Sequence, residues 1–399
     1  MKPLADYSHI RGIHLSNFPP FANRFHNDKR EPISLEWQLS YCQKLNLNSS
    51  RQFCDFPIYL ADPAGCIDFY RESMRTCWRY GVSTMQILFN GNSLDRTLYI
   101  LEPEWWEEVG DKYVRDMVLA LKDEPGLLMW DVMNEPSCNL WYKDASPEEQ
   151  PERWEKINRF LKHYCDLIHE LDPDGCLTIG HTTPDDLEPS NEWVDVICFH
   201  DYTETRARIN HAYDMALEAG QKYGKPVINS ETCCLCRANP YDVAIEIAMQ
   251  RKTGFYVFNL VSEGYWGEVH GLIYPDGTVR NPDAVAALYG FFRNRTPSRI
   301  KAKPNREGYV YRALKFLEES LTDDTGLFRN TPRTTDEILE AAEYAANLME
   351  CNEMVPMIDP PSAKIADWRA MPPEERDLEE VRKFAYELGK TLKEYCQVL

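Results

Sequence analysis

Two glutamates, each at the end of a short apolar run, are the residues of this chain whose positions best suit chemistry. Glu135 follows the run Leu127–Met133 and precedes Pro136, and Glu231 ends the run Pro226–Ser230. Proline has no backbone N–H, so a β-strand is expected to stop before Pro136 and to leave Glu135 at its end. Two carboxyl groups that face each other across a pocket can cleave a glycosidic bond, one as a proton donor and the other as an anion. A single glutamate at a strand end is more often only solvated, whereas the pair predicts a catalytic site.

The elements that must position these glutamates alternate regularly over residues 1 to about 300. Short β-like runs are separated by amphipathic stretches at the helical period, for example Arg206–Tyr223. Crossover helices return the chain to the same end of a sheet, so we expect parallel strands. The eight predicted strands are Ser8–Leu15, Leu47–Phe53, Val82–Phe89, Leu127–Met133, Leu177–Gly180, Val194–His200, Pro226–Ser230 and Gly254–Val261.

Eight strands are the number that closes a (β/α)8 TIM barrel, which is the fold that we predict for residues 1–300. A doubly wound open sheet is the competing architecture, and the absence of a Gly-rich phosphate loop after the first run disfavours it. Catalytic residues of such barrels lie at the C-terminal ends of the strands. Glu135 and Glu231 end runs four and seven, so we expect them to converge at that end.

The pattern changes in residues 301–399, for which we predict a C-terminal helical extension. Helical segments are predicted near Arg306–Leu321, Asp336–Cys351 and Glu374–Gln397. Thr334 with Glu337 three residues later has the form of a capping box. The apolar stripes of these helices suit packing on the barrel, a small helical domain or a homo-oligomer contact, and the sequence leaves these three alternatives open.

The segment around Glu135 resembles a known signature. Trp130 to Pro136 reads Trp-Asp-Val-Met-Asn-Glu-Pro, which is similar to the strand-four Asn-Glu-Pro signature of clan A glycoside hydrolases, and especially to family five, the cellulases and mannanases. The likeness extends over about 290 residues in order. Arg51 ends the second run, His200-Asp201-Tyr202 resembles the family's His-x-Tyr, and Ile228–Glu231 resembles its nucleophile strand.

This resemblance implies a role for each matching residue. Glu135 would be the general acid/base and Glu231 the nucleophile of a retaining β-glycosidase that acts on a β-linked hexoside or oligosaccharide. Asn134 would hold the sugar hydroxyl next to the reacting carbon, and His200 would line the subsite. Tyr202 would donate a hydrogen bond to Glu231, and Arg51 would help to keep Glu231 ionised. The chemistry needs no metal and no cofactor.

The chain also departs from the family pattern at two strand ends. The third run ends in Asn90, where the family often has histidine, and the eighth run has no tryptophan to serve as a stacking platform. Trp266, just beyond the eighth run, is a candidate replacement. His14 and His181 end other runs and are candidates either for contacts with sugar hydroxyls or for satisfied rim positions. These departures bear on the identity of the sugar more than on the reaction.

Composition excludes several classes of partner. The chain has 44 basic and 64 acidic residues and a net charge of −20, so no basic stripe for nucleic acid or for an anionic membrane surface is present. The first residues show no apolar h-region, which predicts a cytoplasmic location. The 13 cysteines are scattered and are expected to be free thiols. The cluster Cys233-Cys234-Leu235-Cys236 lacks a second pair at zinc-binding spacing, so metal binding there is disfavoured.

Two alternatives to a glycosidase remain at this stage. A non-catalytic carbohydrate-binding protein on the same barrel would explain the altered strand ends, but it has no need of two facing carboxylates. A metal-dependent hydrolase would need several histidines at strand ends. His14, His181 and His200 are present, but no His-x-His follows the first strand.

Overall fold

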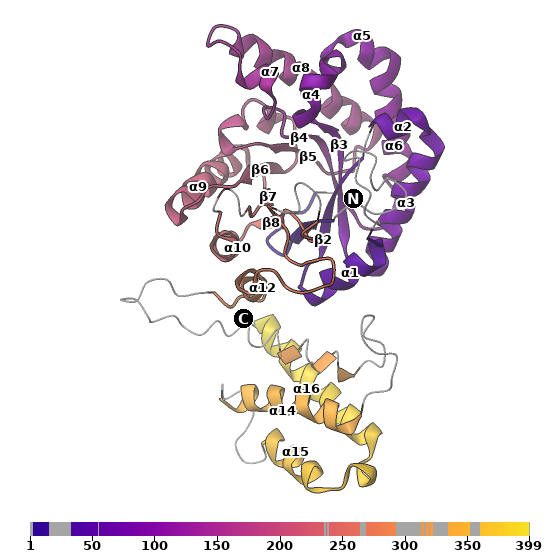
Figure 1. The fold of residues 1–399 in the computed structure, drawn as a ribbon, viewed down its shortest axis with the longest axis vertical. Coiled ribbons are helices and arrows are strands. Elements are labelled where there is room, and N and C mark those ends of the chain that lie inside the picture. The colour runs from indigo at the N-terminus through magenta and orange to yellow at the C-terminus, as the bar shows by residue number, and fades with distance from the viewer. Residues whose placement is uncertain are drawn as a thin grey trace. The chain divides into compact units, whose positions relative to one another are not determined.

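The computed structural model describes residues 3–15, 33–54, 56–234, 237, 239–263, 269–292, 313–314, 317–318, 320–321, 334–351 and 360–398. The chain forms two compact units, Met1–Leu288 and Tyr289–Leu399. The first unit is an eight-stranded parallel barrel with helices around it (Figure 1). The predicted fold class is therefore confirmed.

The eight strands pair in sequence order, and β1 closes the barrel by pairing with β8. Five of them, β4 to β8, are buried along their whole length. This burial explains why they read as nearly continuous apolar runs, because helices cover their outer faces and side chains fill the inside. The strands are β1 (Arg11–His14), β2 (Ser49–Phe53), β3 (Ser83–Asn90), β4 (Leu127–Asn134), β5 (Leu177–His181), β6 (Ile197–Asp201), β7 (Val227–Thr232) and β8 (Gly254–Val257).

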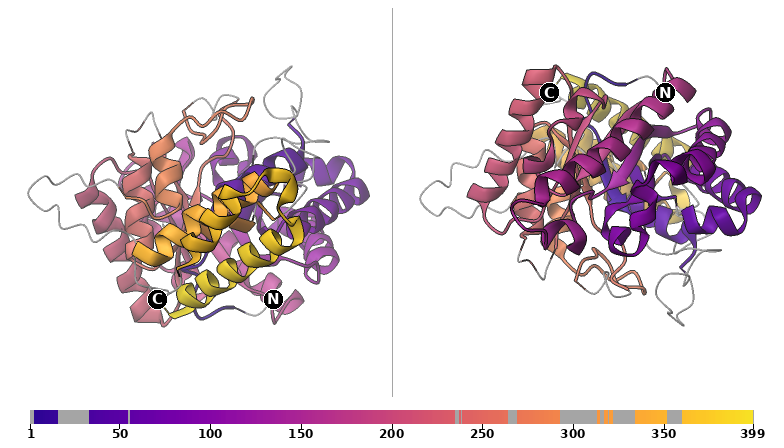
Figure 2. Two further views of the ribbon diagram at one scale, coloured as in Figure 1. Left: turned by 90° about the horizontal axis from the view of Figure 1, so that it is seen from below. Right: turned by 90° about the horizontal axis from the view of Figure 1, so that it is seen from above.

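Long helices follow most of the strands and surround them when the molecule is viewed from above (Figure 2). Between β5 and β6 the connection contains only two short 3-10 turns, Pro184–Asp186 and Ser190–Glu192. The main barrel helices are α1 (Leu35–Lys44), α3 (Pro63–Arg79), α6 (Asp111–Leu121), α8 (Gln150–Leu171), α9 (Arg206–Tyr223), α10 (Tyr241–Gln250) and α12 (Pro282–Leu288).

Local signals fix where several of these helices begin and end. The Ser34 hydroxyl accepts a hydrogen bond from the backbone N–H of Trp37 at the start of α1, and Thr205 caps α9 in the same way. Gly224 caps the C-terminal end of helix α9, and its φ of 66° is the left-handed conformation that glycine adopts without strain. The predicted start and end of this helix, at Arg206 and Tyr223, agree with the structure.

The second unit has its own apolar core, built from helices α14 (Thr335–Cys351), α15 (Pro361–Ala370) and α16 (Leu378–Val398) together with residues around Leu317. The capping box is present: Thr334 Oγ1 accepts from the N–H of Glu337 at 3.3 Å, and Glu337 Oε2 accepts from the N–H of Thr334 at 3.0 Å. Helix α15 lies outside the helical segments predicted for residues 301–399. Pro361 occupies its first turn, where no N–H is required.

Candidate active site

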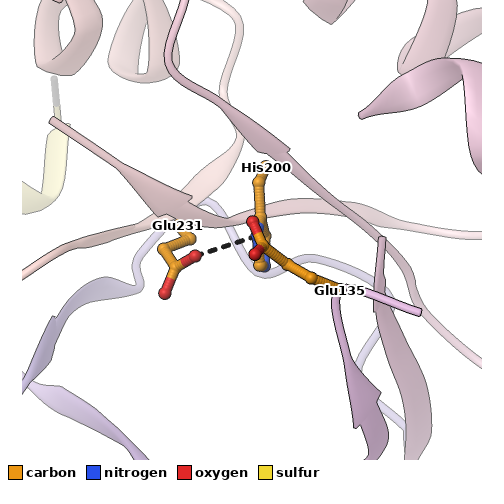
Figure 3. Close-up of side chains that lie close together, drawn as sticks. All are labelled: Glu135, His200 and Glu231. Carbon is orange, nitrogen blue, oxygen red and sulfur yellow. Dashed lines mark hydrogen bonds and ion pairs between the residues drawn. The ribbon is translucent and has the colours of Figure 1, made fainter. Parts of the chain in front are cut away.

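Glu135 lies just beyond β4 in an unusual backbone conformation. Its φ is 47°, and its N–H donates to the carbonyl of Gly180 on β5 at 2.7 Å. Gly91 packs so closely against this turn that a Cβ at residue 91 would come within 2.1 Å of the Glu135 carbonyl oxygen. Left-handed backbone is rare for a glutamate and costs free energy, so the surrounding structure must hold it in place. These contacts direct the Glu135 side chain toward β6 and β7 (Figure 3).

Glu231 lies within β7, and the strand itself holds its backbone. Its N–H donates to the side-chain oxygen of Asn229 at 3.2 Å, while the Asn229 amide donates to the hydroxyl of Tyr213 on α9 at 3.1 Å. Asn229 is therefore a buried link between helix α9 and the strand that carries Glu231. The Glu231 side chain is buried, with only 7% of its surface exposed.

His200, on β6, lies between the two glutamates (Figure 3). Its Nδ1 is 2.9 Å from Oε1 of Glu135 and 2.9 Å from Oε2 of Glu231. The polar atoms of the three side chains all lie within 4.8 Å of one another. Burial opposes the charged imidazolium, but the charge of Glu231 and the hydrogen bonds to both carboxylates outweigh it and raise the pKa of His200. The structure thus brings together the two glutamates and the histidine that the sequence nominated.

Arg51, on β2, supports Glu231 from within the barrel. Its Nη1 lies 3.6 Å from Oε1 of Glu231 and makes no hydrogen bond to the residues that the structure describes. The other guanidinium nitrogens are bound: Nε and Nη2 donate to Oδ2 of Asp131 at 3.0 and 2.6 Å, and Nη2 also donates to Oδ1 of Asn134 at 3.0 Å. Arg51 therefore joins the nucleophile candidate to β4.

The electrostatic balance at Glu231 favours its anion. Burial raises the pKa of a carboxyl group, but the charge and hydrogen bond of His200, followed by His14 and Arg51, reverse this and hold the pKa of Glu231 well below its usual range. His14 Nε2 lies 3.8 Å from Oε1 of Glu231. His14 itself is buried, and desolvation lowers its pKa to about 3.

Tyr202 is at the site but does not make the expected contact. Burial, followed by the charges of Glu231 and Glu135, raises its pKa far above the usual value, so its hydroxyl is close enough to feel both carboxylates. No hydrogen bond joins Tyr202 to Glu231 among the described residues. The Tyr202 ring instead packs edge-on against His270 at 5.6 Å and lies 4.7 Å from the guanidinium of Arg237.

The remaining candidates from the sequence fall into three groups. Asn134 lies at the site, where its amide donates to Oδ1 of Asn90 at 3.2 Å. His181 is buried and contacts neither glutamate in the described part of the chain; its Nε2 is 2.6 Å from the Ser190 hydroxyl, while its Nδ1 has no hydrogen-bond partner among the described residues. Trp266 and Cys236 lie outside the described residues. Ten cysteines between Cys42 and Cys234 are free thiols, as expected.

Three supporting residues were not identified from the sequence. Asp131 binds Arg51, Asn229 holds the backbone of Glu231, and Asn90 accepts from Asn134. Asp131 carried a signal that could have found it, because a lone charged residue in an otherwise apolar strand needs a buried partner. The other two required knowledge of which strand positions face each other.

Comparisons with known proteins agree with this fold. No protein-family model matches the chain. A segment of 180 residues is 24% identical to human β-glucuronidase, and it makes up 41% of this chain but only 24% of that protein. The chain thus spans about a quarter of the curated relative that it matches.

Among solved structures, a β-glucosidase from Thermotoga maritima aligns with a TM-score of 0.52 at 12% identity, covering 70% of this chain and 96% of that one. Cellulose synthase subunit Z from Clostridioides difficile aligns with a TM-score of 0.51 at 13% identity, covering 70% and 99%. β-Glucuronidase 2 from Bacteroides uniformis aligns with a TM-score of 0.50 at 13% identity, covering 72% and 35%. At the level of the fold, these neighbours agree with the resemblance to clan A glycoside hydrolases.

No described helix is long and apolar enough to cross a membrane.

Proposed function

We propose that the chain is a retaining β-glycosidase, in which Glu231 is the nucleophile and Glu135 is the general acid/base. One observation carries the proposal: oxygens of the two carboxyl groups lie within 4.8 Å of each other, at the C-terminal ends of β4 and β7. Retaining enzymes have their carboxyl groups about 5–5.5 Å apart, whereas inverting enzymes need about 6.5–9.5 Å to admit a water molecule. The short separation favours direct attack by a carboxylate on the sugar.

The surroundings of the site suit the two half-reactions. Arg51, His14 and His200 favour the anion of Glu231, which attacks the anomeric carbon while Glu135 donates a proton to the leaving oxygen. Glu135 then takes a proton from water, and that water releases the sugar from Glu231. His200 contacts both carboxyl groups and so holds the donor and the nucleophile in register. The substrate class that follows is a β-linked glycoside or oligosaccharide, with Asn134 at the sugar hydroxyl.

The proposal is tested with a panel of aryl β-glycosides: glucoside, mannoside, galactoside, xyloside and glucuronide. Glu135→Gln and Glu231→Gln are each expected to abolish turnover of the best substrate, because amides neither donate a carboxyl proton nor attack the sugar. A 2-fluoroglycoside of the preferred sugar is expected to add one glycosyl mass to Glu231. Matched controls are Glu188→Gln and Glu204→Gln, which alter exposed acidic residues paired with Lys222 and Arg208.

The outcomes separate the alternatives. Normal turnover in either glutamine variant of the site would remove that residue from its role. A wild-type chain that binds oligosaccharides in calorimetry but releases no phenol from any glycoside would instead be a carbohydrate-binding protein on this barrel. Adduct formation at another residue would reassign the nucleophile.

A further inference from the structure

We propose that Glu135, His200 and Glu231 also form a binding site for a divalent transition-metal cation, and that a cation bound there inhibits the protein. In the described part of the chain, this is the one place where three side chains that can ligate a metal bring their atoms within 4.8 Å of one another. All three residues are buried. The cation takes no part in hydrolysis, since it occupies the two carboxylates that the reaction needs.

The spacing between His200 and each glutamate fits a metal. A cation with bonds of about 2.1 Å and right angles between them holds neighbouring ligand atoms about 3 Å apart. His200 Nδ1 is 2.9 Å from an oxygen of each glutamate. The donors come from the C-terminal ends of three strands, β4, β6 and β7, so the barrel holds all three at the same end.

The charge of the site also fits a dication. When both glutamates are ionised and His200 has released its proton to act as a ligand, Asp131, Glu135 and Glu231 supply three negative charges, and Arg51 supplies one positive charge. The remainder of two negative charges equals the charge that a divalent cation neutralises. Because Asp131 already binds Arg51 through two nitrogens, the guanidinium is oriented toward β4 and only its Nη1 lies near Glu231.

The donor set selects the kind of metal. One imidazole with two carboxylates suits zinc, nickel and copper, whereas magnesium and calcium prefer oxygen donors throughout. We therefore expect Zn²⁺, Ni²⁺ and Cu²⁺ to bind, and Mg²⁺ to bind at least tenfold more weakly than Zn²⁺.

The experiment uses the full chain and measures binding separately from activity. Calorimetry with Zn²⁺ is expected to give one site per chain, with at least tenfold weaker binding in Glu135→Gln, in Glu231→Gln and in His200→Ala. The electron paramagnetic resonance spectrum of the Cu²⁺ complex is expected to show coupling to nitrogen that disappears in His200→Ala. The matched control is His163→Gln. His163 is a half-buried histidine that does not belong to the three-residue cluster, and its Nε2 lies 2.7 Å from Oδ1 of Asp111.

The effects of these variants and of Zn²⁺ on activity test the metal site. If Zn²⁺ binds equally well to both glutamine variants, or if binding is lost in His163→Gln, the site is elsewhere and the inference is wrong. Where the chain hydrolyses a glycoside, Zn²⁺ is expected to inhibit in proportion to site occupancy, and EDTA is expected to restore activity. A chain that binds Zn²⁺ at these residues but hydrolyses no glycoside would contradict the proposed function and leave the metal site standing.

Discussion

The buried pair of Arg51 and Asp131 gives the sharpest quantitative prediction. Both side chains have 0% of their surface exposed, and their closest atoms, Nη2 and Oδ2, are 2.6 Å apart. Asp131→Asn removes the negative charge and leaves the guanidinium in a low-dielectric interior. Breaking a buried ion pair by removing one partner costs about 3–5 kcal/mol. We expect Asp131→Asn to lower the free energy of unfolding of the barrel by about that amount.

The assay is urea unfolding followed by tryptophan fluorescence. Nine of the ten tryptophans fall within residues 1–288, so the fluorescence transition reports mainly on the barrel.

The double variant Asp131→Asn with Arg51→Met removes both charges. Its loss of unfolding free energy is expected to be smaller than the sum of the two single losses by at least about 1 kcal/mol, because the single variants each leave one unpaired charge. Its activity stays low, since Glu231 has lost Arg51.

Comparing the stability and the activity of the double variant separates the structural role of Arg51 from its effect on Glu231. Recovery of stability without recovery of kcat would show that Arg51 acts on Glu231 and is more than a structural cation. The reasoning is refuted if Asp131→Asn costs less than about 1 kcal/mol, or if the double variant costs the full sum.

Three further predictions concern pH and helix capping. Because the pKa of Glu231 lies below its usual range, the acid limb of kcat/KM is expected below about pH 4.3, and Arg51→Met should move it upward in a pH–rate profile. The pKa of His181 is lowered to about 3 by burial, so its contribution to stability is present above the unfolded value of about 6.5 and is lost as the pH falls toward 3. His181→Asn should therefore flatten the dependence of urea midpoints on pH over this window. Thr334→Ala is expected to destabilise the second unit by about 1 kcal/mol, as checked by its thermal midpoint, with Thr391→Ala as an exposed control.

The sequence was enough to predict the barrel and the two glutamates, because both depend on patterns along the chain. Continuous apolar runs mark strands that are buried on both faces, and a carboxylate next to proline marks a strand end. Helix α9 begins and ends where its helical period predicts, and Thr205 and Gly224 cap it in the structure. The first strand was predicted from Ser8 to Leu15, but only Arg11–His14 finds partners on β2 and β8.

What could not be predicted depends on contacts between strands. The pairing of Asn134 with Asn90 requires the register of β3 against β4, in which these two residues are neighbours. The predicted hydrogen bond from Tyr202 to Glu231 is absent among the described residues. The tyrosine ring instead contacts His270 and Arg237, which are distant from it in sequence. Patterns of residue type carry no information on such distant neighbours.

The different surroundings of the two glutamates argue for their different roles. Nitrogens of Arg51 and His200 lie within 3.6 Å of Glu231. Among the cationic side chains that the structure describes, only His200 comes as close to Glu135. Positive neighbours stabilise the anion of a carboxyl group, and Glu231 has more of them than Glu135. This difference supports the proposed assignment of Glu231 as the nucleophile, because Nη1 of Arg51 lies 3.6 Å from Oε1 of Glu231.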